Sequence, residues 1–101
     1  MRVEVFYIDG CPNHKPVVER VKKVLQQERI SVPLVEVEIH DEREAKKIGF
    51  LGSPTVRING LDVDPECRAG TATGMTCRYY TGGLPSEEMI CTALREAERI
   101  R

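Results

Sequence analysis

Residues 3–14 read VEVFYIDGCPNH and combine a strand, a turn and the start of a helix. The side chains of residues 3–8 are mostly apolar and rich in β-branched and aromatic types, which predicts a strand buried on both faces in the middle of an α/β sheet. Asp9-Gly10 then turns the chain. A helix is expected over residues 12–29, because Pro12 suits a first helical position and apolar side chains follow at helical spacing.

The rest of the chain continues this alternation of strands and helices. The expected elements are a strand at 34–39, a short helix at 40–48 ended by Gly49, strands at 55–58 and 61–63, and a helix at 86–101. Asn59-Gly60 between the two short strands is the strongest short hairpin signal in the chain. The first two strands, which are joined by a helix, should be parallel with a right-handed crossover. The order β-α-β-α-β-β-α predicts one α/β domain over residues 1–101.

Composition excludes several functional classes. The chain has 101 residues, of which 41% are hydrophobic and 31% charged, which is typical of one small globular domain with one core. A formal net charge of −1 gives no electrostatic reason to expect a nucleic-acid partner. No apolar run approaches the roughly 20 residues of a membrane helix, and Glu4 stands where a signal peptide is apolar. We therefore expect a cytoplasmic protein without a membrane partner.

The expected compartment affects how the cysteines are interpreted. Cytoplasmic thiols stay reduced, so catalytic, redox or metal roles are favoured over structural disulfides. The loop at about 64–85 holds Cys67 and Cys77, and loops longer than about 12–15 residues are often functional. Cys91 lies at the edge of the apolar stripe of the last helix and is expected to be a small core or boundary residue.

Cys11 is the main candidate for chemistry. It follows a buried strand and is expected at the cap position of a helix, where free N–H groups and the helix dipole stabilise a thiolate and make the sulfur nucleophilic. His14 is three residues further on, so its imidazole can come near the sulfur on the same helix face. The alternative is an inert, buried cysteine with a surface histidine.

With these residues the chain resembles the thioredoxin superfamily, most closely its small glutaredoxin-like members. The resemblance covers residues 1–63 and the final helix, and rests on CPNH at 11–14 and GSPTVRING at 52–60. It implies a thioredoxin-like fold with a mixed four-stranded sheet flanked by helices. It also implies a cis peptide bond before Pro54, facing the reactive cysteine, and backbone hydrogen bonds from Ser53 to a bound thiol peptide. The substrate-binding residues it implies are Pro12, Ser53, Pro54 and Thr55.

The chain departs from this family at one important position. Dithiol members have a second cysteine where this chain has His14, so no disulfide can form within the motif. The chemistry is then monothiol, or the resolving thiol comes from Cys77, Cys67 or external glutathione. Cys77 ranks above Cys67, because the neighbouring Arg78 can stabilise a thiolate. A disulfide between Cys67 and Cys77, or two free surface thiols, are the alternatives.

Three functions follow from these residues. The first is a thiol–disulfide oxidoreductase acting on protein or low-molecular-weight thiols and disulfides, with His14 stabilising the thiolate or shuttling a proton and with no bound cofactor. The second is binding of a soft metal, Hg(II) or Cu(I), by Cys11, Cys77 and His14, or cleavage of an organomercurial with Asp9 as proton donor. It reflects a similarity to small thioredoxin-like proteins labelled alkylmercury-lyase-like. The third is a non-catalytic binding module on the same scaffold.

Overall fold

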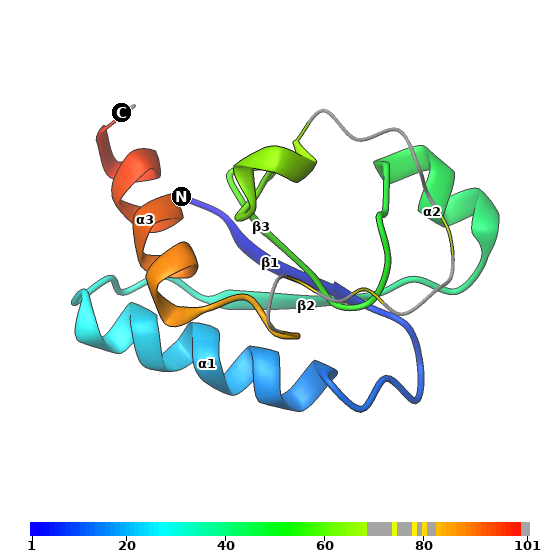
Figure 1. The fold of residues 1–101 in the computed structure, drawn as a ribbon, viewed down its shortest axis with the longest axis horizontal. Coiled ribbons are helices and arrows are strands. Elements are labelled where there is room, and N and C mark those ends of the chain that lie inside the picture. The colour runs from blue at the N-terminus through cyan, green and yellow to red at the C-terminus, as the bar shows by residue number, and fades with distance from the viewer. Residues whose placement is uncertain (69–73, 75–77, 79, 81–82, 100–101) are drawn as a thin grey trace.

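A computed structural model describes residues 1–68, 74, 78, 80 and 83–99 (Figure 1). The elements follow the predicted order, with a short 3₁₀ helix, η1, in addition. They are β1 (Val3–Tyr7), α1 (His14–Gln27), β2 (Leu34–Glu38), α2 (Glu42–Ile48), β3 (Thr55–Ile58), β4 (Leu61–Asp62), η1 (Pro65–Cys67) and α3 (Glu87–Arg99).

The four strands form one mixed sheet in the order β2-β1-β3-β4. β1 is parallel to β2 and antiparallel to β3, and β3 is antiparallel to β4. The predicted strand at the start of the chain is therefore central, and Val3 and Val5 are completely buried. Asn59 and Gly60 both have positive φ angles, 54° and 82°, as the tight turn between β3 and β4 requires.

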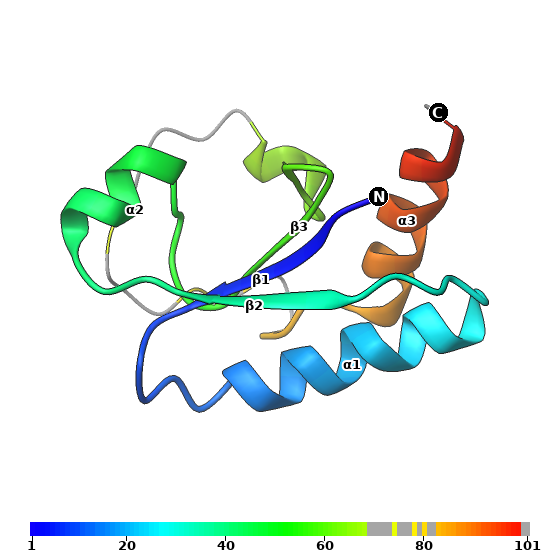
Figure 2. The ribbon, with the colours of Figure 1, turned by 180° about the vertical axis from the view of Figure 1, so that it is seen from behind.

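The two faces of the sheet carry different cores. Val5 lies opposite Val56, and this face packs against α1 and α3 in the larger hydrophobic cluster. The opposite face presents Phe6, which packs with Ala45 of α2 and with Phe50 in the smaller cluster. Figures 1 and 2 show α1 along one side of the sheet, with α2 and the yellow-green η1 on the other. The β1–α1 turn therefore leads to one face, and η1 covers the other.

The predicted helix at 12–29 is shorter than expected. It begins at His14, with Asn13 and not Cys11 at the N-cap position. Residues before it form a turn, because the N–H of Cys11 donates to the carbonyl of Ile8 (3.2 Å) and the N–H of His14 donates to the carbonyl of Cys11 (3.3 Å). The expected position of Cys11 at the helix cap is therefore wrong by two residues. The dipole effect falls off within the first turn of a helix, so it acts on Cys11 less directly than at the cap.

The strand at 55–58 lies where it was predicted, and the other boundaries differ by at most two residues. The expected stop of the short helix at Gly49 is confirmed, with φ at 68°, and Asp41 caps its start by accepting the N–H of Glu44 (2.8 Å). The predicted loop at 64–85 contains η1 and, among its described residues, an isolated β-bridge between Tyr80 and Gly83. Within the described part of the chain, no helix is both long and apolar enough to cross a bilayer.

Candidate functional site

Cys11 lies in the turn between β1 and α1, with its side chain partly exposed. Two hydrogen bonds connect this turn to the segment before β3. The N–H of Cys11 donates to the carbonyl of Ile8 (3.2 Å), and the N–H of Ile8 donates to the side-chain oxygen of Ser53 (3.1 Å). The two motifs are therefore physically connected, because Ile8 and Ser53, which are 45 positions apart in the sequence, form a hydrogen bond beside the Cys11 turn.

The expected cis peptide bond between Ser53 and Pro54 is confirmed. Ser53, Pro54 and Thr55 are all buried. Their polar groups are satisfied within the chain: the Thr55 hydroxyl donates to the carbonyl of Gly52 (2.6 Å), and the carbonyl of Ser53 accepts the N–H of Arg78 (2.8 Å). Pro12, the remaining predicted substrate contact, is exposed in the Cys11 turn.

His14 is held by two residues that sequence reasoning missed. Its ring stacks on Tyr7, with centroids 3.6 Å apart and planes 7° from parallel, and its Nε2 lies 2.7 Å from Oε1 of Glu36. An ionised carboxylate can only accept, so Nε2 carries a proton and Nδ1 of the neutral ring is the acceptor. In the described part of the chain, the hydrogen-bond partner of the ring is Glu36, and its link to Cys11 runs through the backbone.

Strand parity explains this arrangement and was readable in the sequence. Tyr7 alternates with Val3 and Val5 and therefore points to the face of the sheet that α1 covers. Glu36 is the register partner of Val5 across the parallel pair and lies on that same face. The first residue of α1, His14, is thus placed over both side chains.

Arg78, whose N–H donates to the carbonyl of Ser53, forms a buried ion pair with Asp62. The guanidinium of Arg78 donates to both carboxylate oxygens of Asp62, at 2.6 and 3.0 Å, and both side chains are more than nine-tenths buried. The guanidinium carbon also lies 3.9 Å from the centre of the Tyr80 ring. The Tyr80 oxygen accepts the N–H of Val56 (3.2 Å), and burial, reinforced by Asp62, raises the pKa of this phenol.

This network shows which described residues the guanidinium of Arg78 contacts. The sequence suggested that Arg78 stabilises a thiolate at Cys77, which itself lies outside the described residues. Among the described residues, the guanidinium donates to Asp62 and to the hydroxyl oxygen of Thr55 (3.3 Å). The signal was weak, because Asp62 and Arg78 are 16 positions apart and no periodic pattern relates them.

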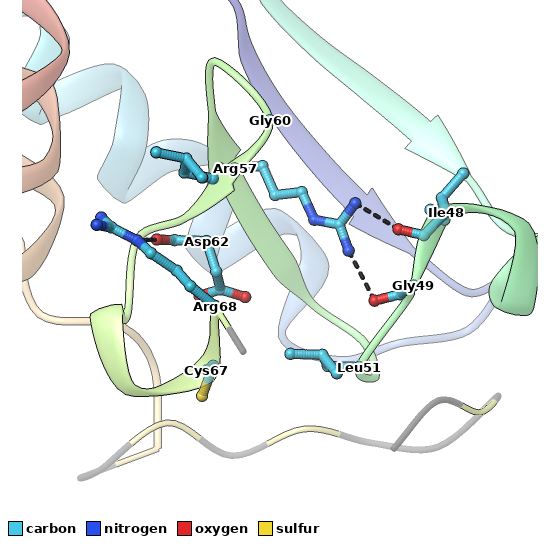
Figure 3. Close-up of a pocket in the computed structure, with 9 residues that line it drawn as sticks. Ile48, Gly49, Leu51, Arg57, Gly60, Asp62, Cys67 and Arg68 are labelled. Carbon is cyan, nitrogen blue, oxygen red and sulfur yellow. Dashed lines mark hydrogen bonds between the residues drawn. The ribbon is translucent and has the colours of Figure 1, made fainter. Parts of the chain in front are cut away.

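Cys67, the other predicted resolving thiol, lies in η1 at the wall of a cavity of about 210 Å³. Figure 3 shows it near Asp62 and Arg68, while Arg57 donates to two carbonyls at the end of α2. Burial raises the pKa of Cys67, and the nearby carboxylates of Asp64 and Asp62 add to this effect, while Arg78 opposes it. The thiol form is therefore favoured.

Cys67 and Cys11 are not brought together. The cavity opens on the sheet face of Arg57 and Asp62, whereas the Cys11 turn leads into α1 on the opposite face (Figures 1 and 3). Cys91 packs at the boundary of the larger core, as expected, and its pKa is raised by burial and by its hydrogen bond to Glu28. Cys11, Cys67 and Cys91 carry free thiols.

A metal centre has no counterpart in the described residues, which contain no group of three or more His, Cys, Asp or Glu side chains arranged to hold an ion. The set predicted for a soft metal includes Cys77, which is outside those residues. In comparisons with known proteins, no family model, no curated protein and no solved structure matches the chain. The site must therefore be interpreted from its own geometry.

Proposed function

We propose that this protein has a thioredoxin-like fold and acts as a thiol–disulfide oxidoreductase, with Cys11 as the nucleophile. The observation that carries the proposal is the hydrogen-bonded route from Cys11 through Ile8 to Ser53, which holds a partly exposed thiol beside a buried segment. The order of the elements and of the strands supports the fold. The proposed location is the cytoplasm, where thiols are kept reduced.

The proposed reaction is thiol–disulfide exchange. The Cys11 thiolate attacks one sulfur of a disulfide, a bond forms between them, and the other sulfur leaves as a thiolate with the bonding electron pair. External glutathione or Cys77 then attacks the mixed disulfide and returns Cys11 to the thiolate. Cys67 is less suited to this second step, because burial raises the pKa of its thiol and disfavours the thiolate.

His14 is proposed to handle the proton. Stacking on Tyr7 and the bond to Glu36 restrict the ring to one orientation and direct the proton to Nε2. Nδ1 is then the nitrogen that accepts a proton from the Cys11 thiol or returns one to the leaving sulfur. Glu36 acts through His14 and is a positioning residue in this proposal.

A coupled assay of small-disulfide reduction with glutathione tests the proposal. Cys11→Ser should lower the rate by about 100-fold or more, because the hydroxyl cannot form the mixed disulfide. Cys91→Ser is the matched control, since it removes a thiol at the core boundary far along the chain, and its rate should stay within about twofold of wild type. Full activity in Cys11→Ser would overturn the proposal.

A further inference from the structure

The backbone of residues 50–53, which is connected to the Cys11 turn, already forms hydrogen bonds within the chain. Three carbonyls in residues 50–53 accept internal hydrogen bonds: that of Phe50 from the N–H of Gly74 (3.2 Å), that of Gly52 from the hydroxyl of Thr55 (2.6 Å), and that of Ser53 from the N–H of Arg78 (2.8 Å). This is the segment that Ile8 connects to the Cys11 turn. Three carbonyls of the segment that is connected to the Cys11 turn are therefore occupied.

Arg78 is firmly anchored in this position. Its side chain is 8% exposed, donates to both carboxylate oxygens of Asp62 and lies over the ring of Tyr80. Moving its main chain away from Ser53 requires the buried pair to shift or separate, and an uncompensated buried charge is strongly unfavourable. An incoming chain thus cannot easily displace Arg78 from the Ser53 carbonyl.

Extended peptides commonly bind by pairing their main chain with free backbone groups, while small ligands need no such edge. We propose that Arg78 determines the substrate preference at Cys11: its main chain occupies the position beside Ser53 that an extended peptide would use, so peptide disulfides gain no main-chain contacts there and are not preferred to small disulfides. This inference rests on the proposed function. The exchange itself is unchanged, with a bond from Cys11 Sγ to one substrate sulfur and the second sulfur leaving as a thiolate.

Two substrates with the same reacting bond show whether an extended peptide gains main-chain contacts at Cys11. One is the mixed disulfide of free cysteine and glutathione, and the other is the same glutathione disulfide on the central cysteine of a short extended peptide. The second-order rate constants with the wild-type protein should agree within about threefold, because the peptide gains no main-chain contacts. A third substrate, methylated on the amide nitrogens that flank the cysteine, should react at the same rate as the unmethylated peptide.

A variant tests the part played by the anchor. Asp62→Asn weakens the hold on Arg78 and should raise the rate with the peptide relative to the small disulfide. Glu87→Gln makes the same change of acid to amide in an exposed pair with Lys23 and should leave the ratio unchanged. Hydrogen exchange at the Arg78 amide in the wild-type protein should be slow, which tests the occupied edge even if Asp62→Asn does not fold.

The outcomes are distinct. A peptide that reacts about tenfold faster than the small disulfide, and loses this gain on methylation, would overturn the inference while leaving the proposed function intact. Exchange of the Arg78 amide at the rate of an unprotected chain would also overturn it. If neither disulfide reacts with Cys11, the proposed function itself fails, and the inference fails with it.

Discussion

The side-chain oxygen of Ser53 accepts the N–H of Ile8 at 3.1 Å, and this bond joins the end of β1 to the segment before β3. Ser53 is 1% exposed, so solvent cannot reach this site to replace the hydroxyl as the hydrogen-bond partner of Ile8. The carbonyl of Ile8 in turn accepts the N–H of Cys11 (3.2 Å). Through Ile8, the position of the Cys11 turn depends on a serine that is remote in the sequence.

Ser53→Ala should therefore affect stability and reactivity together. The Ile8 N–H loses its partner in a partly buried site, which costs about 1–3 kcal/mol of the free energy of unfolding. The Cys11 turn also loses its tether, and we expect the rate of reaction with a small disulfide to fall by about tenfold. Urea unfolding and stopped-flow kinetics on the same preparation measure the two effects.

Ser86→Ala is the control for this variant. The Ser86 hydroxyl oxygen accepts the N–H of Met89 (3.0 Å) at the start of α3, so its loss costs about 1 kcal/mol as a helix cap. The Cys11 rate should stay at the wild-type value. Equal slowing in both variants would show that the rate follows overall stability and not the contact between Ser53 and Ile8.

Asp62→Ala should be among the most destabilising single changes in the chain. It leaves the guanidinium of Arg78 buried without its carboxylate, which typically costs about 3–5 kcal/mol. Glu87→Ala breaks an exposed pair with Lys23 (3.2 Å) and should cost no more than about 1 kcal/mol. Guanidinium chloride midpoints give the comparison, and similar small losses for both variants would contradict the importance of the buried pair.

Glu36→Gln should slow the reaction of Cys11 without unfolding the protein. An amide can donate as well as accept, so it no longer fixes the proton of His14 on Nε2. Nδ1 is then no longer always the accepting nitrogen, and we expect the rate of reaction of Cys11 to fall by about three- to tenfold. Glu38→Gln on the same strand is the control, because Glu38 faces the exposed His40 at 3.6 Å. Comparable rates for both variants and wild type would rule out a positioning role for Glu36.

Stability should decrease in alkaline solution. The pKa values of Cys67 and Tyr80 are both raised in the folded state, chiefly by burial. Their contribution is fully present below the unfolded pKa values, about 8.5 for cysteine and 10 for tyrosine, and is lost as the pH rises through the folded values. Denaturation midpoints under reducing conditions should fall from about pH 8 to pH 11, and the fall should be smaller in Tyr80→Phe. Midpoints that rise over this range would contradict the account.

The order of elements could be predicted because strong local signals agree with the final fold. Asn59-Gly60 takes the positive φ angles of its turn, and Gly49 ends α2 in the left-handed conformation. The start of α1 was misplaced, because the preference of Pro12 for a first helical position competes with a turn stabilised by the Ile8 carbonyl. The hydrogen bond from Cys11 to the Ile8 carbonyl does not alter the pattern of apolar residues, so hydrophobic periodicity could not predict it.

The candidate site was only half predictable. Cys11, His14 and Ser53 follow from motifs, since each motif is short and local. The Asp62–Arg78 pair joins a two-residue strand to a residue in a long loop, and such long-range polar contacts have no sequence period. Glu36 could have been found from strand parity once the parallel pairing of the first two strands was accepted, because its register partner Val5 points towards α1.

Identification of the first thiol to react is the most direct test of the central claim. The wild-type protein is mixed with glutathione disulfide, quenched by alkylation at increasing times, and each cysteine is mapped by mass spectrometry. We expect the glutathione adduct to appear first on Cys11, at least about tenfold ahead of Cys67 and Cys91, whose thiols are kept protonated by raised pKa values. Cys11 that stays unmodified while Cys67 or Cys91 reacts would contradict the account.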